Sequence, residues 1–218
     1  MDFIFDHCSS LNFINISSFN TTLTTNMGSF VSFCSSLTSL DLSNLDTSNV
    51  VTMESMFEGC SKLTSLNLLQ FKTSKVSIMK NMFQGCSLLT SLDLSNFDIS
   101  AVNNLESMFD NCENLEYINL KNASIQQNNI NLSNAFSKTA LNLVLCTLDT
   151  ILIEKVLENE CAIKDCSENW RERRKKIVIA TNTCVNNCTF LNDSFEYDSK
   201  CYIIKTAQIK VIGFYILI

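Results

Sequence analysis

The sequence contains no proline and only four glycines in 218 residues. Collagen-like chains and flexible linkers depend on these residues, so their scarcity excludes both classes. A phosphate-binding glycine loop is excluded as well, because the glycines lie far apart along the chain. Hydrophobic residues make up 46% of the sequence and charged residues 17%, which indicates a folded chain with a buried core.

Basic residues and histidine are also scarce. The net charge of −6 argues against a nucleic-acid partner, which would need a basic face to neutralise phosphates. The single histidine, His7, is not part of a recognisable catalytic arrangement. We therefore expect no enzymatic activity, no catalytic residues and no cofactor.

Export and membrane signals are not visible. Residues 1–7 are acidic where a signal peptide would be basic, and no apolar run reaches the roughly 18 residues of a membrane span. The last residues, Lys210–Ile218, resemble the start of such a span, a final strand or the end of an incomplete gene model. Because the repeats described next begin inside the first copy, we expect a fragment of a longer protein whose membrane anchor is missing.

Cysteine, by contrast, is abundant, and five of the eleven cysteines recur every 26 residues. These column cysteines are Cys8, Cys34, Cys60, Cys86 and Cys112. Leucine or isoleucine follows three, six and eight residues after each, as Leu37, Leu40 and Leu42 follow Cys34. An L-x-x-L-x-L core with a period between about 20 and 29 residues is the signature of leucine-rich repeats.

Each repeat predicts one coil of a solenoid. In L-x-L the apolar side chains alternate, so they point inward from a short strand. Next come Val50, Met53, Met56 and Phe57, whose spacing predicts a short helical or 3₁₀ segment that ends at Gly59. We expect an α/β solenoid of 26-residue leucine-rich repeats, with short parallel strands on one face and these segments on the other. A small cysteine-rich C-terminal segment completes the expected fold.

The decay of the pattern predicts the boundaries of four segments. These are a solenoid over 1–146, a capping helix over 147–160, a cysteine-rich module over 161–205 and an apolar tail over 206–218. In the fifth repeat the apolar residues Ile130, Leu132, Ala135 and Phe136 indicate a slip of one residue. Residues 141–146 predict a sixth strand, and the amphipathic helix after it would close the open end of the stack.

Two repeats carry a family resemblance. M-E-S-M-F-E-G-C-S-K-L-T-S-L-N-L at 53–68 and M-K-N-M-F-Q-G-C-S-L-L-T-S-L-D-L-S-N-F at 79–97 resemble the BspA-type leucine-rich-repeat surface proteins of oral bacteria, mycoplasmas and protists. The resemblance implies a cell-surface or secreted adhesin-like protein. Its implied partner is a protein or glycoconjugate on a host cell or in the matrix. The tail is similar to cysteine-rich extracellular segments of protist surface proteins.

The tail cysteines follow the spacing C-x4-C-x17-C-x3-C-x12-C. They are Cys161, Cys166, Cys184, Cys188 and Cys201. Disulfides are favoured, because so short a segment has little core of its own. Zinc is the alternative, although paired C-x2-C knuckles are missing and His7 is the only histidine. For the column cysteines, buried thiols are favoured and oxidation between neighbouring coils is the alternative.

The basic run at 171–176 is interpreted as a solvated face, with contact to an acidic partner or to phospholipid as the alternative. Two functions stay open for the chain as a whole. The first is an extracellular, non-catalytic interaction or adhesion protein that binds its partner through outward strand positions. These positions are Phe13, Ser39, Asp41, Ser65, Asn67, Ser91, Asp93, Tyr117 and Asn119. The second is an intracellular leucine-rich-repeat scaffold with reduced or metal-bound tail cysteines.

Overall fold

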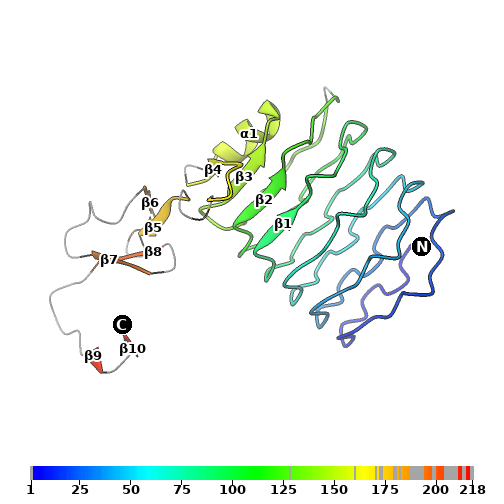
Figure 1. The fold of residues 1–218 in the computed structure, drawn as a ribbon, viewed down its shortest axis with the longest axis horizontal. Helices are drawn as coiled ribbons and strands as arrows, with labels where there is room; N and C mark the ends of the chain where they lie inside the picture. The colour runs from blue at the N-terminus through cyan, green and yellow to red at the C-terminus, as the bar shows by residue number, and fades with distance from the viewer. Residues whose placement is uncertain are drawn as a thin grey trace.

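The computed structural model of the protein describes residues 2–127, 129–159, 161–169, 171, 174–178, 181, 183–186, 194–197, 200–203, 211–212 and 215–216. Its elements are β1 (Ser91–Asp93), β2 (Tyr117–Leu120), β3 (Val144–Thr147), α1 (Thr150–Leu157), β4 (Ile163–Lys164), β5 (Lys176–Val178), β6 (Thr183–Val185), β7 (Ser194–Tyr197), β8 (Lys200–Ile203), β9 (Val211–Ile212) and β10 (Tyr215–Ile216) (Figure 1). β6, β5, β8 and β7 form a second sheet in that order, and β9 pairs with β10. β9 and β10 lie within the expected apolar tail, most of which is outside the described residues.

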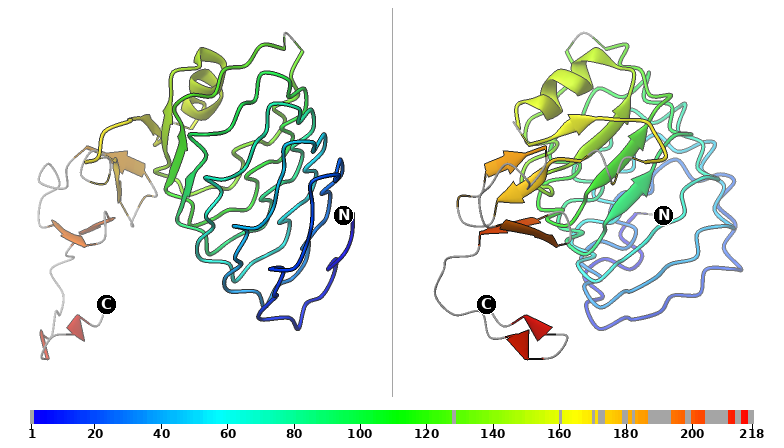
Figure 2. Two further views of the ribbon diagram at one scale, coloured as in Figure 1. Left: turned by 45° about the vertical axis from the view of Figure 1, so that its right-hand side comes forward. Right: turned by 60° about the vertical axis from the view of Figure 1, so that its left-hand side comes forward.

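The repeats form a stack of coils, one coil for each repeat, with the N-terminus at one end and α1 at the other (Figures 1 and 2). One side of the stack carries a parallel sheet in which β1, β2, β3 and β4 are neighbours in that order. The register joins equivalent positions of successive repeats, since Leu92 pairs with Ile118 and Ile118 with Leu145. β3 lies at the sixth strand expected over 141–146.

A second ladder of hydrogen bonds holds the coils together on the opposite side, and we call it the turn ladder. In it, alternate main-chain N–H groups donate to carbonyls of the next coil. The N–H groups of Met53, Ser55, Phe57 and Gly59 donate to the carbonyls of Ile78, Lys80, Met82 and Gln84 at 2.7–3.0 Å. The same pattern recurs between the other coils, from residue 3 to residue 111. All of these N–H groups point toward the C-terminal end of the stack.

Left-handed residues explain why the turn ladder replaces the short helical segments that the sequence predicts. Each turn segment contains two residues with positive φ, such as Ser55 at 57° and Gly59 at 68°. A left-handed residue ends a helix, so two of them four residues apart leave only single turns. One of these turns joins the Met56 N–H to the Met53 carbonyl at 3.3 Å. Gly59 also meets a steric demand, because a Cβ there would lie 2.6 Å from the ring of Phe33.

The last turn segment contains one extra residue. Isolated parallel bridges join Asn26 to Thr52, Thr52 to Ile78 and Ile78 to Asn104, each at the 26-residue period. Asn104, however, pairs with Asn131, one residue beyond the period. The slip read from the fifth repeat is therefore present in the structure, and the columns on either side of it remain aligned.

The core consists of side chains that stack on their own equivalents in neighbouring coils. Leu37, Leu63, Leu89 and Leu115 are all fully buried. Phe57, Phe83, Phe109 and Phe136 form a continuous column in which ring centroids lie 5.4–5.7 Å apart. Because each coil packs mainly against its two neighbours, the stack gains its stability from these repeated contacts.

A column of buried threonines joins the coils in a way that the sequence analysis did not anticipate. The Thr47 hydroxyl donates to the carbonyl of Lys72 at 3.1 Å and accepts from the Lys72 N–H at 2.7 Å. Thr21 and Thr73 make the same pair of bonds to the residues that follow them by 25 positions. Each hydroxyl thus satisfies both main-chain groups of one residue in the next coil.

Thr47→Val is expected to lower the free energy of unfolding by about 1–3 kcal/mol, because two part-buried hydrogen bonds between the Thr47 hydroxyl and the Lys72 main chain are lost. Urea denaturation followed by circular dichroism measures the change. Thr64→Val, at an exposed position, is the matched control and should change stability by less than about 0.5 kcal/mol. Equal effects from the two substitutions would contradict a structural role for the threonine column.

α1 closes the C-terminal end of the stack. Asp149 caps it, with its Oδ1 accepting from the Leu152 N–H at 3.0 Å. The other carboxylate oxygen accepts from the Ile125 N–H of the fifth repeat at 2.8 Å, which ties the cap to the stack. Leu152 and Val156 form the buried face of the helix. Among the described residues, no helix has the length and apolar character needed to cross a membrane.

Candidate functional site: the strand face

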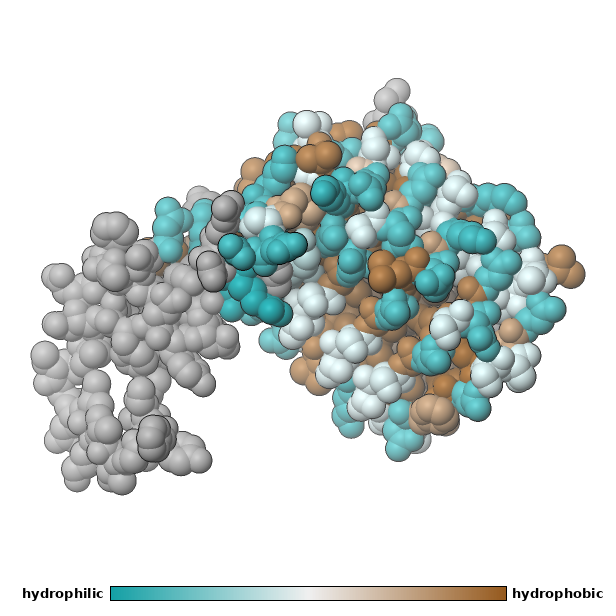
Figure 3. Space-filling view, in the orientation of Figure 1, coloured by the Kyte–Doolittle hydropathy of each residue, from teal (hydrophilic) through white to brown (hydrophobic). Residues whose placement is uncertain are grey.

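The strand face consists of the outward side chains on the sheet side of the stack, at the nine positions that the sequence analysis selected. Six of them, from Ser39 to Asp93, are exposed, and the Phe13 ring is 69% exposed. Tyr117 and Asn119, on β2, are half-buried. The view in Figure 3 shows polar side chains with apolar areas between them on the side that carries β1–β3. The structure therefore brings the nine positions onto one side of the stack.

The second outward position of each repeat also forms a turn. Its side-chain oxygen accepts from the main-chain N–H two residues later, as Asp41 does from Ser43 at 3.0 Å and Asp93 from Ser95 at 3.0 Å. These Asx turns end each strand and direct the chain around the corner. The hydrogen bonds from Ser43 hold the pKa of Asp41 below its usual range. The Asp and Asn side chains at this position therefore have two roles: they line the face, and they form the turns at its edge.

The strand face ends at β3, where the outward positions are covered. In the register of the sheet, Val144 pairs with Tyr117 and Cys146 pairs with Asn119, so the side chains of Val144 and Cys146 point outward. These two β3 residues are nevertheless at most 1% exposed. Cys146 forms a disulfide with Cys166, which brings the segment after β4 over these positions. The open part of the face therefore runs from the first coil to β2, and Tyr117 and Asn119 form its border.

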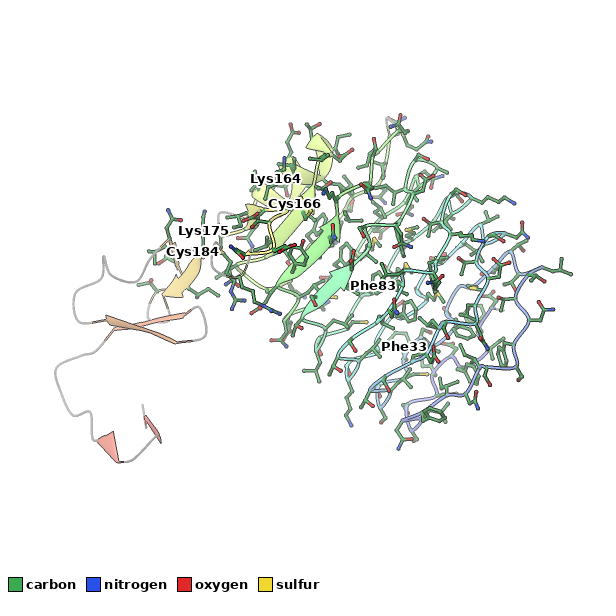
Figure 4. The ribbon with its side chains drawn as sticks, viewed as in Figure 1. Phe33, Phe83, Lys164, Cys166, Lys175 and Cys184 are labelled. Carbon is green, nitrogen blue, oxygen red and sulfur yellow. A yellow bond between two sulfur atoms is a disulfide. The ribbon has the colours of Figure 1, made fainter. Side chains whose placement is uncertain are left out.

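The cysteine pairing differs in part from the expectation for the tail. Cys166 pairs with Cys146, which the sequence analysis had placed in the solenoid, and Cys161 pairs with Cys184. Figure 4 shows Cys166 and Cys184 beside the C-terminal end of the stack. Cys188 and the side chain of Cys201 lie outside the described residues. The first disulfide therefore joins the tail to the stack, and the second lies within the expected cysteine-rich module.

The basic run holds the tail against the strand side. Arg174 is only 5% exposed and forms an ion pair with Glu116, next to β2. The neighbouring Lys175 carbonyl accepts from the Asn142 side chain at 3.0 Å. The interpretation of this run as a solvated face is wrong for Arg174, because its side chain is buried and paired with the Glu116 carboxylate on the stack. Arg171 is exposed, as a solvated face requires.

A hollow of about 290 Å³ lies at the first end of the strand face. It is lined by Phe13, Ile14, Asn15, Ile16, Ser17, Asp41, Ser43 and Asn44. An aromatic ring, a carboxylate and two amides meet there, which suits polar contact with a peptide or a sugar. Among the described residues, no group of three or more His, Cys, Asp or Glu side chains could hold a metal ion.

The five column cysteines are free thiols, and four of them bond to the previous coil. The thiols of Cys34, Cys60, Cys86 and Cys112 donate to main-chain carbonyls 29 residues earlier at 3.0–3.1 Å. Burial raises the pKa of Cys34 to about 11 and those of Cys60 and Cys112 to about 12. Because the thiolate is the nucleophile, two properties protect these thiols from chemical modification: they are buried, and they stay protonated at neutral pH.

We expect N-ethylmaleimide at pH 7.5 to leave the four buried column cysteines unmodified in the folded protein and to modify all of them in urea. Peptide mass spectrometry locates the adducts. Cys8 is half-buried in the first coil and is the internal comparison, expected to react before the others. Rapid labelling of Cys60 or Cys86 under native conditions would show that the stack opens between coils.

The comparisons with known proteins identify a family for the repeat region. The family model described as "Mycoplasma protein of unknown function, DUF285" matches residues 1–122. No curated protein and no solved structure matches the chain. The match covers more than half of the 218 residues and contains the coils that form the open strand face. The chain therefore belongs to the DUF285 family.

Proposed function

We propose that this protein is a non-catalytic interaction or adhesion protein of the BspA-type leucine-rich-repeat class, and that its partner binds the open strand face. The observation that carries the proposal is the contrast between covered and open outward positions. The tail covers Val144 and Cys146 on β3, whereas equivalent positions such as Ser39, Ser65 and Ser91 are exposed.

The chemistry of the face favours a protein or a glycoconjugate as partner. Equivalent side chains recur at the spacing of adjacent strands, roughly 5 Å, so the hydroxyls of Ser39, Ser65 and Ser91 form a row. Hydroxyls, amides and carboxylates in rows suit many similar hydrogen bonds. Phe13 at one end adds an exposed aromatic ring. Such a surface favours broad contact made of repeated weak interactions over one deep ligand pocket.

The two disulfides support a location at the cell surface or outside the cell, because such bonds persist in oxidising compartments. The alternative is an intracellular scaffold with reduced or metal-bound tail cysteines. Mass spectrometry of the native protein separates these functions. Disulfide-linked peptides joining Cys146 to Cys166 support the surface protein, whereas a fully reduced chain with bound zinc supports the scaffold.

Binding is tested with Ser65→Arg combined with Ser91→Arg, which adds two bulky cations to the centre of the row without removing an Asx turn. We expect these substitutions to weaken binding of the purified protein to epithelial cells and to immobilised matrix protein by about tenfold or more, or 1.4 kcal/mol. Ser74→Arg, at an exposed position outside the nine, is the control. Unchanged binding of the double variant would place the partner elsewhere.

A further inference from the structure

The last coil has a row of main-chain N–H groups for which the described residues supply no carbonyl acceptor. In the preceding coil, Leu105, Ser107, Phe109 and Asn111 donate to Asn131, Ser133, Ala135 and Ser137 at 2.8–3.1 Å. The equivalent donors one coil later are the N–H groups of Leu132, Asn134, Phe136 and Lys138. None of these four has an acceptor among the described residues. We call this row the amide ledge.

The amide ledge keeps the conformation of the turn ladder although its acceptors are missing. Asn134 and Lys138 have positive φ of 56° and 50°, as their equivalents do in the earlier coils. The within-coil turns are also present, since Ala135 N–H donates to Leu132 and Ser137 N–H to Asn134, at 3.1 and 3.0 Å. The four N–H groups are therefore already oriented as they are in the coils where the ladder continues.

Helix α1 covers the core beside the ledge but does not satisfy it. The carbonyls of an α-helix bond within the helix along its axis, so a helix packed side-on offers few acceptors to a neighbouring row of N–H groups. A pocket of about 380 Å³ is left between the two. Its lining includes Asn134, Phe136 and Lys138 from the ledge, and Lys155, Val156 and Glu158 from α1 and its C-cap.

We propose that the amide ledge binds an extended, acidic peptide segment of a partner protein. The occupant must offer main-chain carbonyls at two-residue spacing, because that is what every earlier coil offers to the equivalent amides. An unpaired row of this kind is the usual template for edge-on addition of a peptide. In the pocket Lys155 forms an ion pair with Glu158, so the remaining charge is the ammonium of Lys138, which favours acidic side chains. This site lies apart from the strand face.

Two peptides from the protein itself are suitable probes. Residues 104–111, N-L-E-S-M-F-D-N, carry in the folded chain the carbonyls that accept from the coil before, and they are acidic. Residues 78–85, I-M-K-N-M-F-Q-G, carry the same carbonyl pattern and are basic. The pair therefore separates the contribution of the main chain from that of charge.

Amide hydrogen exchange of the intact protein, resolved by NMR, is the measurement. In the free protein the amides of Ser107, Phe109 and Asn111 should be protected and those of Asn134, Phe136 and Lys138 should exchange rapidly. Peptide 104–111 at ten times its Kd should slow exchange on the ledge about elevenfold, since protection scales as one plus the ratio of free peptide to Kd. Peptide 78–85 should bind more weakly.

Lys138→Glu should invert this preference, so that peptide 78–85 becomes the tighter ligand. Lys62→Glu, on an exposed part of the stack, is the control and should leave the preference for peptide 104–111 unchanged. If neither peptide slows exchange on the ledge at millimolar concentration, the proposal is wrong. The proposal is also wrong if, without peptide, the ledge amides are protected from exchange and this protection increases with protein concentration. In that case sedimentation would show a second copy of the chain as the occupant.

Discussion

Phe83→Ala is expected to lower the free energy of unfolding by about 3–5 kcal/mol, the largest effect of any single substitution considered for the stack. The Phe83 ring is fully buried and lies between the rings of Phe57 and Phe109, at 5.6 and 5.7 Å. Removing it opens a cavity in the middle of the aromatic column and ends two ring stacks at once. The coils on either side would lose their ring contact with the coil between them.

Urea denaturation of the purified protein, followed by circular dichroism, measures this loss. Leu23→Ala is the control, because the Leu23 side chain is 90% exposed and should contribute less than about 0.5 kcal/mol. A loss below about 1.5 kcal/mol for Phe83→Ala would mean that neighbouring coils close the cavity, and that the aromatic column is not the tightly packed part of the core.

The second large effect is expected when Cys146 and Cys166 are both replaced by serine. The disulfide joins residues 20 apart in sequence, and removing a bond of this kind costs about 2–4 kcal/mol. The loss should be local, because the bond attaches the segment after β4 to the outward side of β3. We expect β4 to separate from β3 and the covered positions on β3 to become exposed.

Hydrogen exchange at two amides reports this opening directly. The N–H groups of Ile163 and Asp165 donate to Leu143 and Leu145 at 3.0 and 3.1 Å, and they should exchange much faster in the double variant. Amides of the turn ladder, such as Phe83, should keep their protection. Cys8→Ser, which removes a free thiol, is the control. Unchanged exchange at Ile163 would show that the Arg174–Glu116 ion pair and the strand pairing suffice to hold the tail.

Much of the inside of the stack could be predicted from the 26-residue period. Identical spacing places equivalent side chains on top of one another, so Leu63 and Leu89 had to lie in one column once the coils stacked. The turn ladder could not be predicted, because the M-x-x-M-F spacing fits a short helix equally well. The deciding residues are Ser55 and Asn81, which adopt positive φ although they are not glycine. Tertiary hydrogen bonds to the next coil stabilise that conformation.

The candidate site could be predicted only in part, for a different reason. Alternation along the strands was enough to select outward positions such as Ser65 and Asn67, which are exposed. It could not show where the face ends, because that depends on the path of the tail. Disulfide connectivity cannot be deduced from cysteine spacing, and the pairing of Cys146 with Cys166 determines that path.

The strict repetition of the inter-coil contacts has a consequence for how the gene of such a protein can change. The first four coils contact one another through the same threonines, thiols and main-chain ladders, so the loss or duplication of 26 consecutive residues there would join two matching surfaces. A change of 25 or 27 residues within the buried columns would instead misalign all of them. Length variation should therefore accumulate in whole units, with single insertions tolerated only where the last repeat already has one, before Asn131.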